Sequence, residues 1–545
     1  MTETPPSLQR LLDRIGSLPT RRVTWGMVLL FSVWVVLDVF IFKLTGGLAK
    51  SSFDAMVRAR VFVAAPDPRI VILDIDEASL ARMTKEFGRW PWSRDTLATV
   101  LDYVEAQGPS AVVWDILFSD ADRISPGGDA AFNEAVKRSA HSHFSVVRLP
   151  KVNDKLSEIS QAALPALWVA PGLHPVSGSS TVALIPPALP AVAASRLGFN
   201  NGYVDDDGVL RRYRYLEPLP DGSAIQSLPL SVLRALNPVA YQAYSARSSG
   251  SYLDYSDELM AWRREGPAYP HISFADVFDQ AEGGKQLATA PSFAGKIVIV
   301  GATAPSLHDI HATPLFSMQA GVDSLATALD NLLNQRHMAE LPRWVQAMFA
   351  IALCVCLALW GQIKSVGSLA PALLVLPAAL LGISYLSLNG LPMFVDLHLA
   401  AGLALVFLAL LRYWNTLRRN YWCSPPLSEQ PLAIWPLARH DAWSEAPLDR
   451  LIDVVEHHVP DCRVVVCDAH EGGLATPRWP ELARFAAVVG PLNSLLAART
   501  QLEPALLCLA NRSGEWVMLD MPSDREKLAS QVFSAWHAFQ KIDSK

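Results

Sequence analysis

Charged, aromatic and hydroxyl side chains follow several short apolar runs of this chain, between residues 69 and 309. If those runs are parallel strands, a ligand crevice is expected beyond their carboxyl ends, near a point where the strand order reverses. Aromatic walls and a few convergent polar groups are what such a crevice needs to bind a small molecule. The candidate ligand-binding residues are Asp74, Asp76, Glu77, Trp90, Arg94, Asp115, Thr303 and Asp309.

The same residues also have a purely structural interpretation, because buried charges are usually paired whatever their function. Asp115 lies within an apolar run, where an ion pair with Arg94 would hold the connection between two strands. Trp90 and Trp92 would then be packing residues. Both interpretations stay open at the level of the sequence.

Metal and covalent chemistry have weaker support in this region. His308, Asp309 and His311 are loosely spaced and no fourth ligand is evident nearby, so we predict no metal site. No nucleophile with an adjacent base stands out in the sequence. We therefore predict no catalytic residue and no cofactor.

The elements that would position these side chains alternate between strand and helix patterns. Helical patterns at 93–108 and 128–140 separate three of the apolar runs, and the first of these helices opens with Ser93. Strand–helix–strand order predicts right-handed crossovers, so we expect an α/β domain with a mostly parallel sheet and helices on both faces. The predicted buried strands are RIVILDID (69–76), SAVVWDILF (110–118), HFSVVRL (143–149) and GKIVIVGAT (295–303).

Other segments of the same region depart from this alternation. GFNNGYVDDDGVLRRYRYLEPL (198–219) has two alternating runs around DDDG and predicts a hairpin. Residues 228–236 and 321–336 have helical patterns, and the second of these leads toward an apolar run. Residues 150–195 are rich in Pro, Ala and Ser and predict a loop-rich segment.

Four long apolar runs predict membrane-spanning helices, each near the roughly 20 residues needed to cross about 30 Å of hydrocarbon. The first run, 25–42, predicts a helix over 25–44, and it is too long for the apolar core of a signal peptide. The other three predicted helices are 344–361, 366–388 and 393–411.

Basic residues predict the orientation of these helices. Arg21 and Arg22 precede the first, Lys364 lies between the second and third, and Arg418 and Arg419 follow the fourth. Four helices place all of them on one face, which this excess of positive charge marks as cytoplasmic. The predicted parts are a cytoplasmic segment 1–24, an extracytoplasmic domain 45–340, and a cytoplasmic linker with a small α/β domain 412–545.

Composition agrees with a multi-pass membrane protein. Hydrophobic residues make up 51% and charged residues 18% of the 545 residues, and the mean hydropathy is +0.22. The net charge of −6 gives no sign of nucleic acid as a partner. None of the six cysteines lies in 45–340, so that domain cannot contain a disulfide.

Five motifs of the central region follow one another along the chain: PDPRIVILDIDEASL, WPWSRDTLATVLDYVEAQGPSAVVWDILFSD, NNGYVDDDGVLRR, HISFADVF and FAGKIVIVGATAPSLHDIHATPL. In this order and spacing they closely resemble the CHASE2 domain, an extracytoplasmic sensory module of bacterial signalling receptors. The resemblance covers roughly residues 50–340 and implies ligand sensing at a bacterial inner membrane, without a defined ligand. The family tends to have Pro-Gly before an acidic residue, whereas this chain has MQAGVD at 318–323. The difference concerns only the geometry of the local turn.

The segment 412–545 has a small α/β pattern without a recognisable catalytic motif. It begins with a Pro-rich linker, CSPPLSEQPLAIWPLARHDAW, and has no P-loop, HRD, DFG or GG[DE]EF sequence. The predicted elements are a helix at 448–459, a strand at 462–469, a helix at 478–500, a hairpin at 503–522 and a helix at 524–542.

Together these features predict an integral membrane receptor that senses an extracytoplasmic stimulus and relays it to a separate effector bound by the small cytoplasmic domain. The alternative is an enzyme-type receptor whose cytoplasmic domain is a divergent cyclase or kinase. The expected partners are an unknown small extracytoplasmic ligand, a cytoplasmic effector protein and the lipid membrane, but not nucleic acid. A homodimer is left open.

Overall fold

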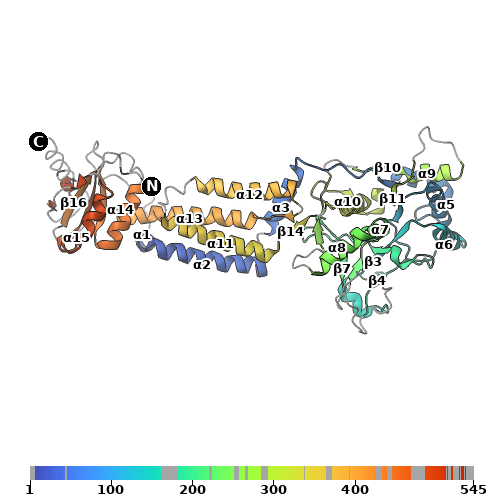
Figure 1. Ribbon diagram of the computed structural model, residues 1–545, viewed down its shortest axis with the longest axis horizontal. Coiled ribbons are helices and arrows are strands. Elements are labelled where there is room, and N and C mark those ends of the chain that lie inside the picture. The colour runs from blue at the N-terminus through green and yellow to red at the C-terminus, as the bar shows by residue number, and fades with distance from the viewer. Residues whose placement is uncertain are drawn as a thin grey trace. The chain divides into compact units, whose positions relative to one another are not determined.

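The computed structural model divides the chain into two compact units (Figure 1). The central unit comprises Thr45–Pro342 with Ile383–Asp396, and the bundle-and-tail unit comprises Met1–Leu44, Arg343–Gly382 and Leu397–Lys545. The residues that the structure describes are 6–42, 46–160, 181–219, 224–250, 257–263, 268–283, 292–336, 338–363, 371–391, 393–424, 432–438, 443, 445–467, 485–510, 512–513, 517–519, 527, 530–532 and 534.

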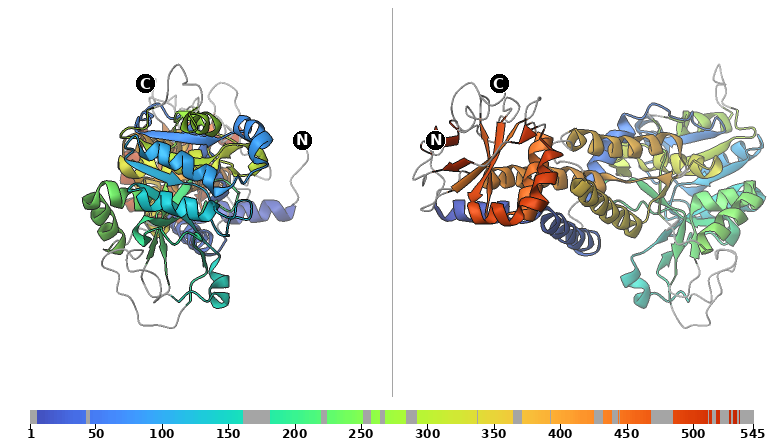
Figure 2. Two further views of the ribbon diagram at one scale, coloured as in Figure 1. Left: turned by 90° about the vertical axis from the view of Figure 1, so that its right-hand side faces the viewer. Right: turned by 60° about the vertical axis from the view of Figure 1, so that its left-hand side comes forward.

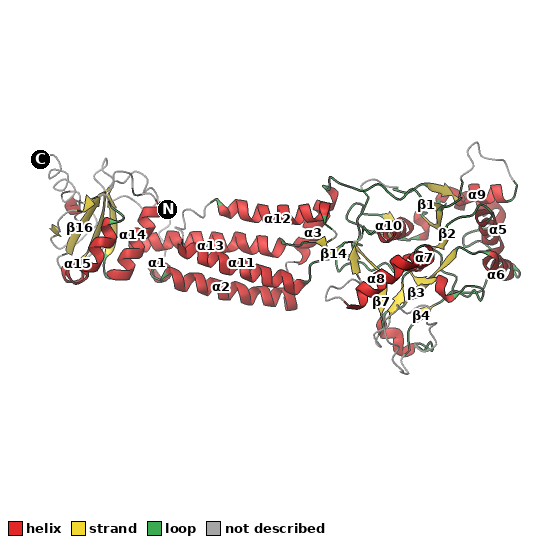
Figure 3. Cartoon of the chain, viewed as in Figure 1, coloured by secondary structure: helices red, strands yellow, loops and turns green. Residues whose placement is uncertain are grey.

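The central unit is built on a mostly parallel sheet, as the sequence predicts (Figure 3). The strand order is β10–β1–β11–β2–β3, with β5 parallel and the short β4 antiparallel to β3. β11 lies between β1 and β2, so that Ile299 faces Ile72 on one side and Val113 on the other. The strands are β1 (Ile70–Ile75), β2 (Ala111–Trp114), β3 (Ser142–Arg148), β4 (Leu184–Ile185), β5 (Leu197–Phe199), β10 (His271–Ser273) and β11 (Ile297–Ala302).

Helices cover both faces of this sheet, because successive residues of a strand point to opposite sides. Ile70 and Ile72 of β1 pack on the face covered by α7 and α10. Val71 and Leu73 pack on the face covered by α5, α6 and α9. The helices are α3 (Gly46–Arg58), α4 (Glu77–Phe87), α5 (Arg94–Glu105), α6 (Gly128–Arg138), α7 (Leu228–Leu236), α8 (Pro238–Gly250), α9 (Phe274–Ala281) and α10 (Gly321–Leu333).

The segment predicted to be loop-rich carries little regular structure where it is described. It contains the 3₁₀ turns η2 (Lys151–Leu156) and η5 (Ala194–Arg196) besides the short β4, and residues 161–180 lie outside the described residues. A third 3₁₀ turn, η6 (Pro305–Leu307), follows β11.

The hairpin predicted at 198–219 is wrong. DDDG does form a turn, in which Gly208 has a φ of +80° and its N–H donates to the carbonyl of Asp205. The runs on its two sides nevertheless pair elsewhere, since the first forms β5 of the main sheet. The second forms β6 (Arg212–Arg214) and β7 (Leu216–Pro218), which pair antiparallel with β9 (Asp257–Leu259) and β8 (Ala224–Gln226).

Arginines after the turn bind carboxylates on distant elements and stabilise this arrangement. Arg214 donates two hydrogen bonds to Asp257 on β9, at 2.6 and 2.7 Å, and so ties the two strands together. Arg211, only 2% exposed, donates two hydrogen bonds to Asp54 on α3, at 2.8 and 2.7 Å. These partners lie far along the chain, and a hairpin could not supply them.

Among the described residues, four helices are long and apolar enough to cross a membrane, as judged by length and composition. In the first, α2 (Thr20–Leu37) continues into a π-helical turn (Asp38–Phe42) whose Asp38 is only 1% exposed. The others are α11 (Arg343–Ile363), α12 (Ala372–Gly390) and α13 (His398–Trp422). Residues 393–397, predicted as helix, instead contain β15 (Met393–Phe394), which pairs in parallel with β14 (Ala339–Glu340).

The end of α13 lies beyond its predicted limit of 411 and makes ion pairs with the tail. Arg419 donates to both carboxylate oxygens of Asp449 on α14, at 2.7 and 2.9 Å, and Arg418 donates to Asp453 at 2.6 Å. Both arginines are less than a tenth exposed. They therefore join α13 to the tail, besides contributing to the predicted orientation. Helix α1 (Pro6–Gly16) belongs to the same unit.

The described residues of the tail form an antiparallel sheet of five strands with α14 and α15 packed on one face (Figure 2, right). Its central strand β16 falls in the segment predicted to be a linker. β18 and α15 replace the single helix predicted at 478–500, and α15 also takes up residues 503–507 of the predicted hairpin. The elements are β16 (Leu432–Ala438), α14 (Glu445–His458), β17 (Arg463–Cys467), β18 (Phe485–Pro491), α15 (Leu492–Leu507), β19 (Arg512–Ser513) and β20 (Val517–Leu519).

The physical reason for these corrections is the shortness of the apolar runs. FAAVVGP in β18 is buried between β16 and β17, and periodicity cannot distinguish such a run from a buried helix segment. Most of the helix predicted at 524–542 lies outside the described residues.

Candidate ligand-binding site

A cavity of about 210 Å³ lies at the carboxyl ends of β2, β3 and β5. Asp115 directly follows β2, and Asn200 directly follows β5. The other walls come from β6, from α10, and from β12 (Ile310–His311), which pairs antiparallel with β13 (Gln319–Ala320). This is the edge at which open parallel sheets generally bind ligands.

Asp115 is held at the cavity wall by the sheet that it leaves. Its backbone N–H donates to the carbonyl of Val300 on β11 at 2.8 Å, one residue past the end of β2. Asn200 donates a side-chain N–H to the Asp115 carboxylate, and Tyr213 donates its hydroxyl to Asn200 Oδ1 at 2.9 Å. A chain of hydrogen bonds thus leads from a buried tyrosine to the carboxylate.

The second carboxylate at the cavity is Asp309, in the loop before β12. Its carbonyl accepts the N–H of Gly321 at 2.9 Å, and a Cβ at position 321 would overlap the Asp309 carboxylate. His311 Nε2 lies 3.6 Å from Asp309 Oδ1, and a Cβ at Gly202 would crowd its ring. Two glycines therefore let the backbone approach these side chains closely.

The cavity favours protonation of its carboxyl groups. Burial raises the pKa of Asp115 to about 7, the negative charge of Asp309 adds to the rise, and the hydrogen bond from Asn200 opposes it. Burial also raises the pKa of Asp309 and His311 lowers it, but this side chain is 44% exposed, so water reduces the effect. Near neutral pH the cavity can therefore take up a proton, or a positively charged group in its place.

Two other candidates, Asp74 and Thr303, bind each other instead of lining the cavity. Thr303 donates its N–H and its hydroxyl to Asp74 Oδ1, at 3.1 and 2.7 Å. His271 lies between Asp74, at 2.8 Å, and Asp323 of α10, at 3.2 Å. Burial by itself lowers the pKa of His271, but the hydrogen bonds and charges of these two carboxylates outweigh it and raise the pKa to about 9. The cluster is satisfied without a ligand.

Asp76 and Glu77 stabilise the start of α4 and a nearby turn. Asp76 is the N-cap and accepts the N–H of Ser79 at 2.7 Å. Glu77 accepts the N–H of Ser306 at 3.1 Å. Neither is among the residues that line the cavity.

Arg94 does not pair with Asp115, so that expected ion pair is wrong. Its guanidinium instead pairs with Asp129 on α6 and donates to a backbone carbonyl in the loop after β2. Trp90 packs edge-to-face on Trp92, with ring centroids 5.0 Å apart. These side chains hold the connection from β1 to α5, away from the described cavity lining.

Of the eight candidate residues, only Asp115 and Asp309 line the cavity. The structure adds Asn200, Tyr213 and His311, which sequence reasoning missed. The Asn-Asn-Gly sequence directly after β5 was an available signal, because polar residues at strand ends line such crevices. Tyr213 offered none, since it lies in an alternating run in which burial is the default expectation.

Metal ligation finds no support in the part of the chain that the structure describes, where no group of three or more His, Cys, Asp or Glu residues is arranged to hold an ion. His308 has a left-handed backbone with a φ of 62°, and its Nδ1 lies 3.0 Å from the carbonyl of Ser306. It therefore does not join Asp309 and His311 at the cavity.

Comparison with known proteins bears on most of the central unit. Residues 27–361 match the CHASE2 domain family, from within α2 to near the end of α11. No curated protein and no solved structure matches the chain. The family match covers more than half of the 545 residues and extends beyond the predicted domain into an apolar helix at each end. The chain belongs to the CHASE2 family.

Proposed function

We propose that this protein is a multi-pass membrane receptor whose CHASE2 domain binds a small, positively charged molecule between Asp115 and Asp309. One observation carries the proposal: two carboxyl groups face the cavity, and none of its described lining residues is a lysine or arginine. An ammonium group would supply the missing charge and donate hydrogen bonds to both carboxylates. A volume of about 210 Å³ is below the roughly 300–1,000 Å³ of drug-sized sites, so the ligand is small.

Helix α10 is the element that would carry the signal. Gly321, Ser324 and Leu325 of this helix line the cavity, and α10 ends at Leu333, ten residues before α11 begins at Arg343. A ligand that binds better to one position of α10 would shift the populations of its positions. Pro342 directly precedes α11, and its ring fixes the backbone φ angle where the connection enters this helix.

The output side rests on ion pairs that two buried arginines of α13 make with α14. Arg418 and Arg419 bind carboxylates of α14, so a displacement of α13 would move the tail domain with it. We infer that the tail lies in the cytoplasm and binds a separate effector, while residues 45–340 lie outside. Reporter fusions at residues 200 and 480 test this topology, and a tail found outside would contradict the receptor.

Ligand binding is tested on the purified full chain in nanodiscs by thermal unfolding with methylammonium, ethanolamine and putrescine, using acetate as an anionic comparison. At pH 8, where Asp115 is ionised, at least one amine should raise the unfolding temperature, and acetate should not. At pH 5 the carboxyl at 115 is protonated, so the apparent affinity should fall about tenfold or more.

Three variants test whether the amine binds at the two carboxylates of the cavity. Asp115→Asn and Asp309→Asn should each remove the response to amines. Asp120→Asn, the same substitution at an exposed position five residues from Asp115, should leave it unchanged. The cavity proposal fails if no amine stabilises the protein, or if the response survives in Asp115→Asn and Asp309→Asn.

A further inference from the structure

A second cavity, of about 220 Å³, lies in the central unit where the chain adjoins two of the apolar helices. Leu391 in its lining directly follows the last residue of α12, and Met338 precedes Arg343, the first residue of α11, by five positions. Five residues of fully extended chain span at most about 18 Å. Chain connectivity alone therefore keeps this cavity close to the ends of both helices.

The lining combines positive charge with apolar surface. Three arginines contribute to it, Arg60, Arg263 and Arg336, and no carboxylate is among its described residues. The remaining described lining residues are Ala64, Ala261, Gln335, Met338 and Leu391. This composition suits an anion that is attached to an apolar group.

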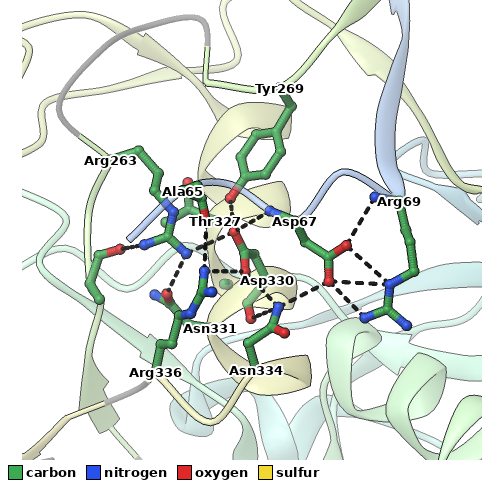
Figure 4. Close-up of polar contacts among 12 residues, drawn as sticks. Ala65, Asp67, Arg69, Arg263, Tyr269, Thr327, Asp330, Asn331, Asn334 and Arg336 are labelled. Carbon is green, nitrogen blue, oxygen red and sulfur yellow. Dashed lines mark hydrogen bonds and ion pairs between the residues drawn. The ribbon is translucent and has the colours of Figure 1, made fainter. Parts of the chain in front are cut away.

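The nearest counter-charge, Asp330 of α10, is already occupied (Figure 4). Asp330 is fully buried and accepts hydrogen bonds from Arg263 at 2.7 Å and from the Tyr269 hydroxyl at 2.9 Å. Asn334 donates to its other oxygen at 2.8 Å, and Arg336 lies 3.4 Å from that oxygen. The Asp330 carboxylate is thus the counter-charge of both Arg263 and Arg336.

Arg60 is the arginine without a counter-charge. Among the described residues its guanidinium has neither a hydrogen bond nor an ion pair, although its Nε is buried. The Nε of Arg263, whose side chain is only 4% exposed, is also buried and unpartnered. Burial lowers the pKa of Arg60, and the charge of Arg263 lowers it further. A guanidinium nevertheless stays charged at physiological pH, so a bound anion would compensate the charge of Arg60 and reduce its repulsion from Arg263.

Contacts with the end of α12 fix the backbone on both sides of Arg60. Tyr385 donates its hydroxyl to the carbonyl of Ala59 at 2.8 Å, and the N–H of Phe62 donates to Asn389 Oδ1 at 3.4 Å. All of these residues belong to the central unit. Arg60 is therefore presented by an anchored segment, which reduces the entropy lost when an anion binds.

We propose that this cavity binds the phosphate group of an anionic phospholipid, with Arg60 and Arg263 as its main charged contacts. Guanidinium groups match phosphate oxygens in bidentate hydrogen bonds. Free phosphate shares this chemistry, but the apolar wall of Met338 and Leu391, next to the ends of α11 and α12, favours a phosphate that carries acyl chains.

The test uses the purified full chain in neutral detergent and compares three probes at one ionic strength: short-chain phosphatidylglycerol, phosphatidylcholine of the same chain length, and inorganic phosphate. Phosphatidylglycerol should raise the unfolding temperature saturably and bind at least tenfold more tightly than either of the other two. Equal affinity for inorganic phosphate would overturn the lipid assignment. Equal affinity for both lipids, or no response to phosphatidylglycerol, would overturn the anion site.

Arg60→Gln is the decisive variant, because this guanidinium has no partner among the described residues whose loss could unfold the chain. Its unfolding temperature without lipid should stay the same or rise, since repulsion from Arg263 is relieved, while its affinity for phosphatidylglycerol should fall at least tenfold. Arg58→Gln, an exposed arginine two positions earlier, is the matched control and should bind as the unmodified chain does. Equal affinities of Arg60→Gln and Arg58→Gln would overturn the assignment of Arg60.

Discussion

The two cavities of the central unit have nearly equal volumes, about 210 and 220 Å³, but opposite charge. Carboxyl groups of Asp115 and Asp309 face the first, and three arginines face the second. Burial acts on both sets with different results, because a carboxyl group can take up a proton whereas a guanidinium keeps its charge. The acidic cavity can therefore become neutral by protonation, and the basic cavity only by binding an anion.

A single helix borders both cavities. Gly321 and Ser324 of α10 line the acidic cavity, while Gln335 and Arg336, just beyond its other end, line the basic one. The 13 residues of α10 span about 20 Å. If the proposed ligands bind, each would act on the same rigid element, one at its first turn and one after its last.

The largest effect in this comparison is expected at Asp330, which compensates the arginines of the basic cavity. Asp330→Ala leaves Arg263 buried without its counter-charge, so we expect a loss of about 3–5 kcal/mol in the free energy of unfolding. Urea unfolding of the full chain in nanodiscs measures it. Asp102→Ala, which breaks an exposed pair with Arg138, is the control and should cost no more than about 1 kcal/mol. Similar losses in the two variants would contradict the role of Asp330.

A smaller, pH-dependent effect is expected at Asp115 in the acidic cavity. Its pKa is about 7 in the folded chain and near 3.8 in the unfolded chain. Between these values only the folded chain holds the proton, so the stability contribution falls as pH rises from 4 to 7 and is constant above. As pH rises from 4 to 8, the free energy of unfolding of Asp115→Asn should therefore increase by about 1–3 kcal/mol relative to that of the unmodified chain. Urea unfolding at several pH values measures this difference. If both chains showed the same pH dependence, burial would not raise the pKa of Asp115.

His271 provides a case between the two extremes, because its positive charge lies between two carboxylates. Its folded pKa of about 9 is above the ordinary 6.5, so its stabilisation is complete below pH 6.5 and is lost as pH rises through 9. We expect the unmodified chain to lose about 1–2 kcal/mol over this window and His271→Gln to lose less. Unfolding measured from pH 6 to pH 10 checks this, and an identical loss in His271→Gln would assign it to other groups.

The smallest effect is expected at an exposed pair outside both cavities. Arg82 binds Asp276 at 2.6 Å on the surface between α4 and α9, with its side chain 47% exposed. Water screens such pairs, so Arg82→Ala should change the free energy of unfolding by less than about 1 kcal/mol. A loss as large as that of Asp330→Ala would mean that burial does not decide the strength of these ion pairs.

Local sequence patterns predicted much of the central fold, but few of the side-chain contacts at the candidate site. The β-branched runs that became β1, β3 and β11 and the four apolar helices follow from period and length alone. Asp115 could be named because it stands near the end of a predicted strand, and Asp309 because it lies just beyond another. The partner of Asp115 could not, since Asn200 stands 85 positions later and the nearer Arg94 is taken by Asp129.

The sequence by itself determined which segments are apolar, which alternate, and which carry charge at their ends, because these properties depend on near neighbours. The tertiary structure decided that β11 enters between β1 and β2, and that the run after DDDG pairs with β9 instead of folding back. It also decided which charges are compensated: Arg263 reaches Asp330 across 67 positions, whereas Arg60, with the same side chain, does not. The free energy of a buried charge depends on what packing brings within a few ångströms of it, and no local pattern records that.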